Sequence, residues 1–124
     1  MTAACATLMI YGCRKETCEA GAGGGYTFEI YPEHHGEAIP GSTCYLEFNT
    51  RSSPGSLADF DLKVETDAGS DFITIKNMGC GDYFIYCVGT DMEDSLTSET
   101  VTGGIPYSIP PGDGKAKIKV PVTE

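Results

Sequence analysis

Hydrophobic and polar residues alternate with a period of two along most of this chain, and this alternation constrains its fold more than any other feature. The clearest runs are Tyr26–Tyr31, Cys44–Asn49, Phe60–Glu65, Ile73–Lys76 and Lys115–Val122. A period of two places apolar side chains on one face of a β-strand, whereas an amphipathic helix needs a period near 3.6. Glycine- and proline-rich breakers separate the runs. The sequence therefore predicts an all-β fold, an antiparallel β-sandwich of the jelly-roll kind.

The remaining segments fit the same architecture. Tyr83–Val88 is continuously apolar, which is typical of a central strand buried on both faces, and strands are also expected at 7–11 and 97–101. The acidic segment Asp91–Thr100 is expected to hold one helical turn at most. The glycines at 21–25 and 103–104 are expected to interrupt strands. With 124 residues, the chain fits one domain spanning residues 1–124.

The cysteine content points to an oxidising compartment and hence to secretion. Six cysteines in so short a chain suit three disulfides. Pairing nearest neighbours is the most economical scheme, although other connectivities remain open, and thiolate ligation of a metal is an alternative that lacks C-x-x-C pairs. The first ten residues do not resemble a signal peptide, so we expect a mature chain with an added or retained Met1. The scheme pairs Cys5 with Cys13, Cys18 with Cys44, and Cys80 with Cys87.

The charge balance narrows the partners. Eighteen acidic residues against eight basic ones give a formal net charge of −10. Nucleic acid and anionic membrane surfaces would be repelled, and no run approaches the ~20 apolar residues of a membrane span. The charge is compatible with a basic partner, with calcium, or with a solvated secreted surface.

A longer pattern, from Cys18 onwards, resembles the CUB domain, an extracellular β-sandwich. Its parts in chain order are Cys18, Tyr31-Pro32, Cys44–Phe48, Pro54-Gly55, Phe60–Glu65, Asp71–Ile75 and Cys87–Gly89. The resemblance implies a CUB-like fold, a role in protein–protein recognition, and Cys18–Cys44 as the bridge closest to the family pattern. The chain departs from that pattern at Leu46, where the family has tryptophan, and at Cys80, which follows the Asp71 strand instead of preceding it.

The acidic segment Glu65–Asp71 is the best candidate site. Its three carboxylates lie between two strands, and calcium prefers six to eight oxygen ligands. The resemblance implies Glu65, Asp71 and Asp113 as calcium ligands, with Asp67 as an alternative. It also implies that the ion orders a loop which receives a basic side chain from a partner protein. The competing interpretation is a solvated acidic turn.

Two weaker candidates lie elsewhere. A transition-metal site at His34-His35 is conceivable, but adjacent residues in an extended loop point in opposite directions, so an exposed loop is expected. Exposed aromatic rings could form a sugar-binding platform. Each of these tyrosines is, however, more often an ordinary strand residue whose hydroxyl contacts water. These candidates are Tyr11, Tyr31, Tyr45 and Tyr107.

Catalysis is not expected, because both histidines lie in one loop and neither G-x-S-x-G nor H-E-x-x-H is present. The sequence therefore predicts a secreted extracellular binding module for a protein partner, supported by calcium. The alternatives are a carbohydrate-binding sandwich whose partner is a glycan, and a structural or assembly subunit of an extracellular filament or coat.

Overall fold

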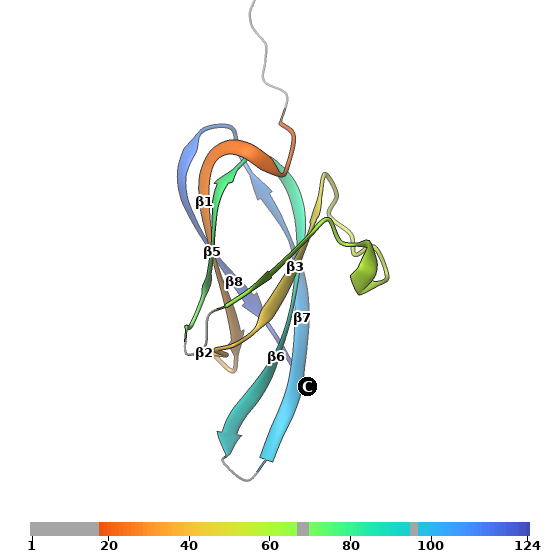
Figure 1. The fold of residues 1–124 in the computed structure, drawn as a ribbon, viewed down its shortest axis with the longest axis vertical. Helices are drawn as coiled ribbons and strands as arrows, with labels where there is room; N and C mark the ends of the chain where they lie inside the picture. The colour runs from red at the N-terminus through yellow and green to blue at the C-terminus, as the bar shows by residue number, and fades with distance from the viewer. Residues whose placement is uncertain (1–17, 67–69, 95–96) are drawn as a thin grey trace, which may run out of the picture.

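The computed structural model describes residues 18–66, 70–94 and 97–124, and these residues form a β-sandwich (Figure 1). The only helical element among them is a short 3-10 helix at Leu57–Asp59. The predicted all-β sandwich is therefore confirmed. The strands are β1 (Ala22–His34), β2 (Glu37–Ala38), β3 (Thr43–Phe48), β4 (Leu62–Glu65), β5 (Ile73–Met78), β6 (Gly81–Asp94), β7 (Thr97–Ile109) and β8 (Asp113–Pro121).

The first sheet is built around β1. On one side β1 pairs antiparallel with β5, and on the other it pairs parallel with β8, in register from Gly25↔Asp113 to Glu33↔Pro121. The short strand β2 folds back on the end of β1. Strand β8 presents Lys115, Lys117 and Lys119 to solvent, in agreement with the alternation predicted for Lys115–Val122, and lysines at this position protect the edge of the sheet from pairing with another chain.

The second sheet is antiparallel throughout, in the order β4-β3-β6-β7. Strands β6 and β7 pair as a long antiparallel ribbon, and the end of β6 and the start of β7 project below the rest of the sandwich (Figure 1). In the segment Asp91–Thr100, where one helical turn at most was expected, Thr90↔Thr100 and Asp91↔Glu99 pair as strand residues, and the strand expected at 97–101 lies within β7. The ribbon continues the alternating ladder beyond the core.

The glycine breakers were also misjudged. Strand β1 already begins within 21–25, and β7 runs through 103–104 without interruption. The physical reason is close approach. A Cβ on Gly24 would collide with the backbone of Gly79, and one on Gly103 with the backbone of Pro121. These glycines let strands lie against neighbouring backbone, so they are strand residues rather than turns.

The core lies between the sheets and follows the predicted alternation. On β6 the side chains of Tyr83, Ile85 and Cys87 are buried, while Phe84 and Tyr86 are half-buried. This central strand is thus fully buried on one face only. The buried Tyr83 hydroxyl donates to the Gly79 carbonyl oxygen at 2.6 Å and accepts from the Gly21 amide at 2.8 Å, so its polar tip is satisfied.

The disulfides correct the predicted pairing. Cys18 bonds to Cys80 and Cys44 to Cys87, whereas Cys5 and Cys13 lie outside the described residues. Cys44 and Cys87 face each other directly across β3 and β6, strands that are distant in sequence. Spacing along the chain favoured near neighbours, but strand pairing decides which cysteines meet. The bridges span 62 and 43 positions, and each contributes about 4 kcal/mol in the chain-entropy model.

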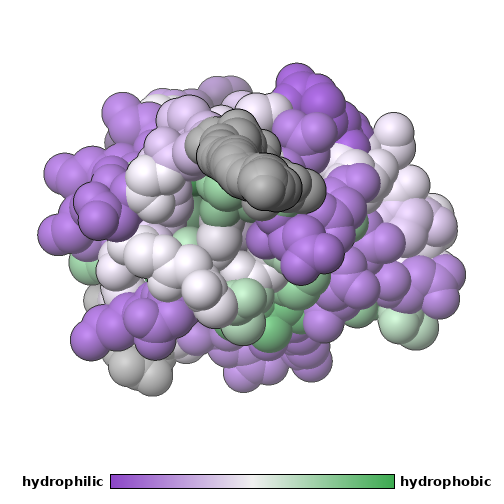
Figure 2. Space-filling model, turned by 90° about the horizontal axis from the view of Figure 1, so that it is seen from above, coloured by the Kyte–Doolittle hydropathy of each residue, from purple (hydrophilic) through white to green (hydrophobic). Residues whose placement is uncertain are grey.

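The observed pairing also removes the Cys18–Cys44 bridge that the CUB resemblance implied, so the cysteines lend that resemblance no support. The two bridges suggest an oxidising, extracellular environment. No helix in the described part of the chain is long and apolar enough to cross a membrane. Viewed from above, the surface is mostly hydrophilic with a few small hydrophobic areas (Figure 2).

Candidate functional site

A two-residue turn joins β1 to β2 and brings two histidine rings together. Glu33 pairs with Ala38 and His34 with Glu37, so His35 and Gly36 form the turn. Both turn residues have positive φ, 55° and 80° respectively, which is the signature of a type I′ hairpin turn. Because the chain reverses direction at this turn, the two imidazole rings lie next to each other, with their centroids 4.0 Å apart. The expectation that these side chains diverge is therefore wrong.

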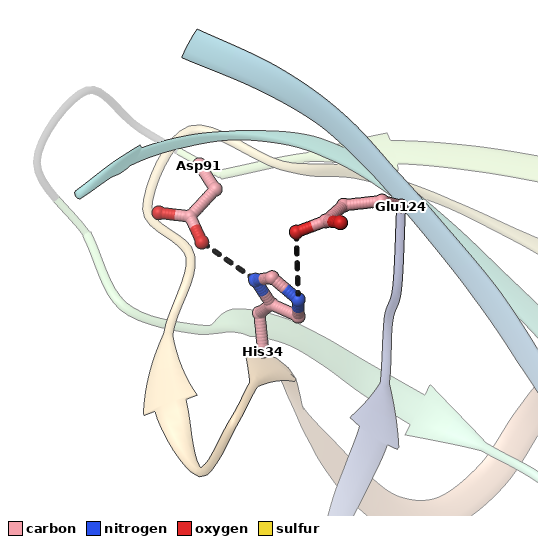
Figure 3. A network of polar contacts seen from close by, with 3 residues as sticks. All are labelled: His34, Asp91 and Glu124. Atoms are coloured by element: carbon pink, nitrogen blue, oxygen red, sulfur yellow. Dashed lines mark hydrogen bonds and ion pairs between the residues drawn. The ribbon is translucent and has the colours of Figure 1, made fainter. Parts of the chain in front are cut away.

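His34 is the buried member of the pair, at 5% exposure. Its Nδ1 lies 2.6 Å from Oδ2 of Asp91, which belongs to the projecting part of β6. The Asp91 side chain is only 14% exposed. The ring stands between Asp91 and Glu124 (Figure 3), with Nε2 3.7 Å from Oε2 of Glu124. Each nitrogen of this buried imidazole thus faces a carboxylate from a different part of the chain.

Backbone contacts hold Glu124 in that place. The Val122 amide donates to the Glu33 carbonyl oxygen at 2.8 Å, beside the end of β1. Thr123 and Thr102 exchange two backbone hydrogen bonds, each of 2.8 Å, which tie this segment to β7. The backbone that leads into Glu124 is therefore held by both sheets.

A further carboxyl group, Glu99 on β7, lies beside Glu124. A side-chain hydrogen bond to Glu124 and the charge of Glu124 raise the pKa of Glu99, and burial and the charge of Asp91 raise it further. His34 acts in the opposite direction. The end of the sandwich around His34 is thus crowded with negative charge.

The ligand geometry of this cluster suits a cation. One ligand atom from each of His34, His35 and Glu124 can be chosen so that all lie within 4.8 Å of one another. Two ligand atoms that each lie ~2.1 Å from a shared ion are separated by roughly 3.0–4.2 Å. The 3.7 Å from His34 Nε2 to Glu124 falls in this range. His35 and Glu124 are exposed, so small rotations of their side chains can complete the arrangement.

The predicted calcium ligands are placed differently. Glu65 ends β4, Asp71 precedes β5, and both are exposed residues near the connection between those strands; Asp67 lies outside the described residues. Asp113 opens β8 opposite Gly25, whereas β5 begins opposite Ile30. Five residues of extended chain, or roughly 16 Å, separate these two levels of β1. The structure therefore does not bring Asp113 together with Asp71, and calcium at Glu65 and Asp71 stays a prediction.

The candidate aromatic platform is divided among separate surroundings. Tyr31 stacks on Phe72 with ring centroids 4.9 Å apart, Tyr107 packs against the core, and Tyr11 lies outside the described residues. Only Tyr45 joins an outward group of rings, with Phe60 and Tyr86. A hollow of about 230 Å³ lies beside that group, lined by Ser53, Gly55, Ser56, Leu57, Phe60 and Tyr86.

Comparison with protein-family models, with curated proteins and with solved structures finds no match for this chain. The candidate site consequently rests on its own geometry. The signal that could have revealed it is Gly36 between two strand-like segments, because glycine readily takes the positive φ that a two-residue hairpin turn needs. Asp91, Glu99 and Glu124 carried no such signal, since they are brought to the turn by strand pairing alone.

Proposed function

We propose that this chain is an extracellular binding module that holds a divalent transition-metal ion between His34, His35 and Glu124. The observation that carries this proposal is the convergence of two imidazoles and a carboxylate within 4.8 Å around a buried histidine. We infer that the protein is secreted, in keeping with its two disulfides.

The donor set decides the class of ion. Imidazole nitrogen suits zinc, copper and nickel, whereas calcium and magnesium prefer oxygen ligands. The carboxylate of Asp91 adds a second feature of transition-metal sites. It lies 2.6 Å from Nδ1 of His34, where it can accept a hydrogen bond from the Nδ1–H group. This fixes the tautomer whose Nε2 lone pair points to the ion. The negative charge of Glu99 and Glu124 further favours a cation.

Isothermal titration of the whole chain with Zn²⁺ and, separately, with Ca²⁺ tests the proposal. We expect one equivalent of Zn²⁺ to bind, with the affinity falling at least roughly 10-fold in His35→Ala and in Glu124→Gln. Both changed side chains are exposed, so the fold should survive. Asp71→Ala is the matched control, because it removes an exposed carboxylate from the calcium candidate instead. Equal Zn²⁺ affinity in His35→Ala and the wild type would contradict the proposal.

A second candidate role, recognition of a protein partner, is favoured by Leu57. It is a large apolar side chain that is 46% exposed, and it lines the hollow beside Phe60 and Tyr86. Exposed apolar groups with aromatic neighbours are typical of partner contacts. Peptides selected from a display library on the immobilised chain should lose binding to Leu57→Asp. Selected peptides that bind Leu57→Asp and the wild type equally would rule out this role for the hollow.

A further inference from the structure

A pocket of about 290 Å³ opens beside the proposed metal site. Its walls are His34, His35, Glu37, Ala38, Ile39, Pro40, Thr90 and Asp91. Both histidines of the metal site therefore belong to the wall of this pocket, whereas Glu124 does not. The volume is several times the ~30 Å³ that one water molecule occupies in the liquid, so it can admit a side chain from another molecule.

An ion held by His34, His35 and Glu124 has an incomplete coordination sphere. The cluster identified among the described residues contributes three ligands, and zinc in proteins takes at least four. Sites with three protein ligands keep a position for water or for an incoming group. Because two of the three ligands line the pocket, that position is reached from the pocket.

The charges around the pocket select the incoming group. Glu37 and Asp91 line it, Glu99 lies beside Glu124, and among the described residues that form its wall there is no lysine or arginine. These carboxylates already offset the positive charge of a bound ion, so they would repel an anionic donor that approaches it. A neutral nitrogen donor meets no such repulsion, and the apolar walls formed by Ala38, Ile39 and Pro40 suit a flat ring.

We propose that the imidazole of a histidine on a partner protein completes the coordination of the metal ion in this pocket. This inference rests on the proposed metal site. Binding forms one bond from the partner's neutral imidazole nitrogen to the ion and releases one bound water molecule. The module then recognises a histidine-bearing partner only when its metal is present.

The test uses the whole chain loaded with Co²⁺, whose visible absorption reports the coordination of the ion. The probes are 4-methylimidazole, which reproduces the histidine side chain, and acetate, both titrated at constant pH and ionic strength. We expect 4-methylimidazole to change the spectrum saturably and acetate to act at least roughly 10-fold more weakly. Equal or stronger binding of acetate would overturn the preference for a neutral donor.

Two variants sharpen the result without touching the proposed ligands. Glu37→Gln removes one wall charge and should narrow the difference between the two probes several-fold. Ala38→Phe fills part of the pocket and should weaken 4-methylimidazole while Co²⁺ affinity stays within about two-fold. Unchanged 4-methylimidazole affinity in Ala38→Phe would place the incoming group outside this pocket and overturn the inference.

The failures of the two proposals can be told apart. If Co²⁺ does not bind, the metal site itself is refuted. If Co²⁺ binds, but neither probe alters the spectrum, the metal site stands and the partner inference falls. Metal-dependent dimers detected by light scattering would show that a second copy supplies the donor, which also overturns the proposal of a separate partner.

Discussion

Two regions of this molecule bring carboxylates together. They differ because only the region around His34 has a buried imidazole with carboxylates arranged around it. At the connection between β4 and β5, the Glu65 side chain is 64% exposed and lies 3.6 Å from the ammonium of Lys63. At the other region, Asp91 and Glu124 face a histidine whose side chain is 4% exposed. Exposed carboxylates must be gathered and desolvated when an ion binds. In the His34 region, part of this free-energy cost is already included in the folding of the chain, because folding brings the carboxylates together around the buried ring.

The comparison also separates two kinds of neighbour. Lys63 already offsets charge beside Glu65, so an arriving cation would compete with it. In the His34 region, an imidazole stands among carboxylates that the strands hold close together, and Glu99 and Glu124 repel one another. An ion arriving there relieves repulsion. The number of carboxylates, which led us to expect a metal site at Glu65–Asp71, is therefore not by itself a measure of the tendency to bind a metal.

The largest effect that would sharpen this contrast is expected from Asp91→Asn. The amide keeps the size of the side chain but removes the charge that orients His34 from 2.6 Å. Outer-sphere partners of this kind typically affect metal affinity by 10- to 100-fold, so a loss of about that size is expected in a Zn²⁺ titration. Asp71→Asn, the equivalent change in the exposed region, should leave Zn²⁺ affinity within about two-fold. Similar losses in both variants would erase the distinction.

A smaller effect is expected from Gly36→Ala, which tests whether the turn sets the ligand geometry. Gly36 has a φ of 80°, which a side chain disfavours, although a Cβ there would meet nothing within 4 Å. We expect a loss of about 1 kcal/mol in the free energy of unfolding, measured by urea titration in chelator. Gly55→Ala, at a φ of 92° in a distant loop, should cost a similar amount without altering Zn²⁺ affinity. A change in Zn²⁺ affinity as large in Gly55→Ala as in Gly36→Ala would disconnect the turn from the site.

The fold could be predicted from the sequence because alternation is a local signal. Runs such as Leu62–Glu65 and Ile73–Lys76 lie on strands of the structure, where the apolar side chains of Leu62, Val64, Ile73 and Ile75 face the core. The disulfides could not be predicted, since Cys44 meets Cys87 only through the pairing of β3 with β6. The His34 region was missed for the same reason. Its residues come from β1, β6, β7 and the segment after β8, and nothing local relates them.

The smallest expected effect concerns Glu99, and its sign follows from linkage. The pKa of Glu99 is raised in the folded protein, first by its hydrogen bond with Glu124 and by that residue's charge. A carboxyl group with a raised folded-state pKa stabilises the fold fully below its unfolded pKa, near 4.3. That contribution is lost as the pH rises through the folded-state pKa. At pH 7 the ionised Glu99 therefore disfavours folding.

Glu99→Gln should accordingly raise the Tm at pH 7 in chelator, by less than Gly36→Ala lowers it, because the site is open to solvent screening. The gain should vanish near pH 3.5, where the wild-type carboxyl is protonated, and shrink in saturating Zn²⁺, where the ion offsets the charge of Glu124. Glu65→Gln, which removes an exposed carboxylate paired with Lys63, should show no comparable gain. A gain for Glu99→Gln that persists unchanged at pH 3.5 would mean that its origin is not this repulsion, and the contrast between the two acidic regions would lose its electrostatic basis.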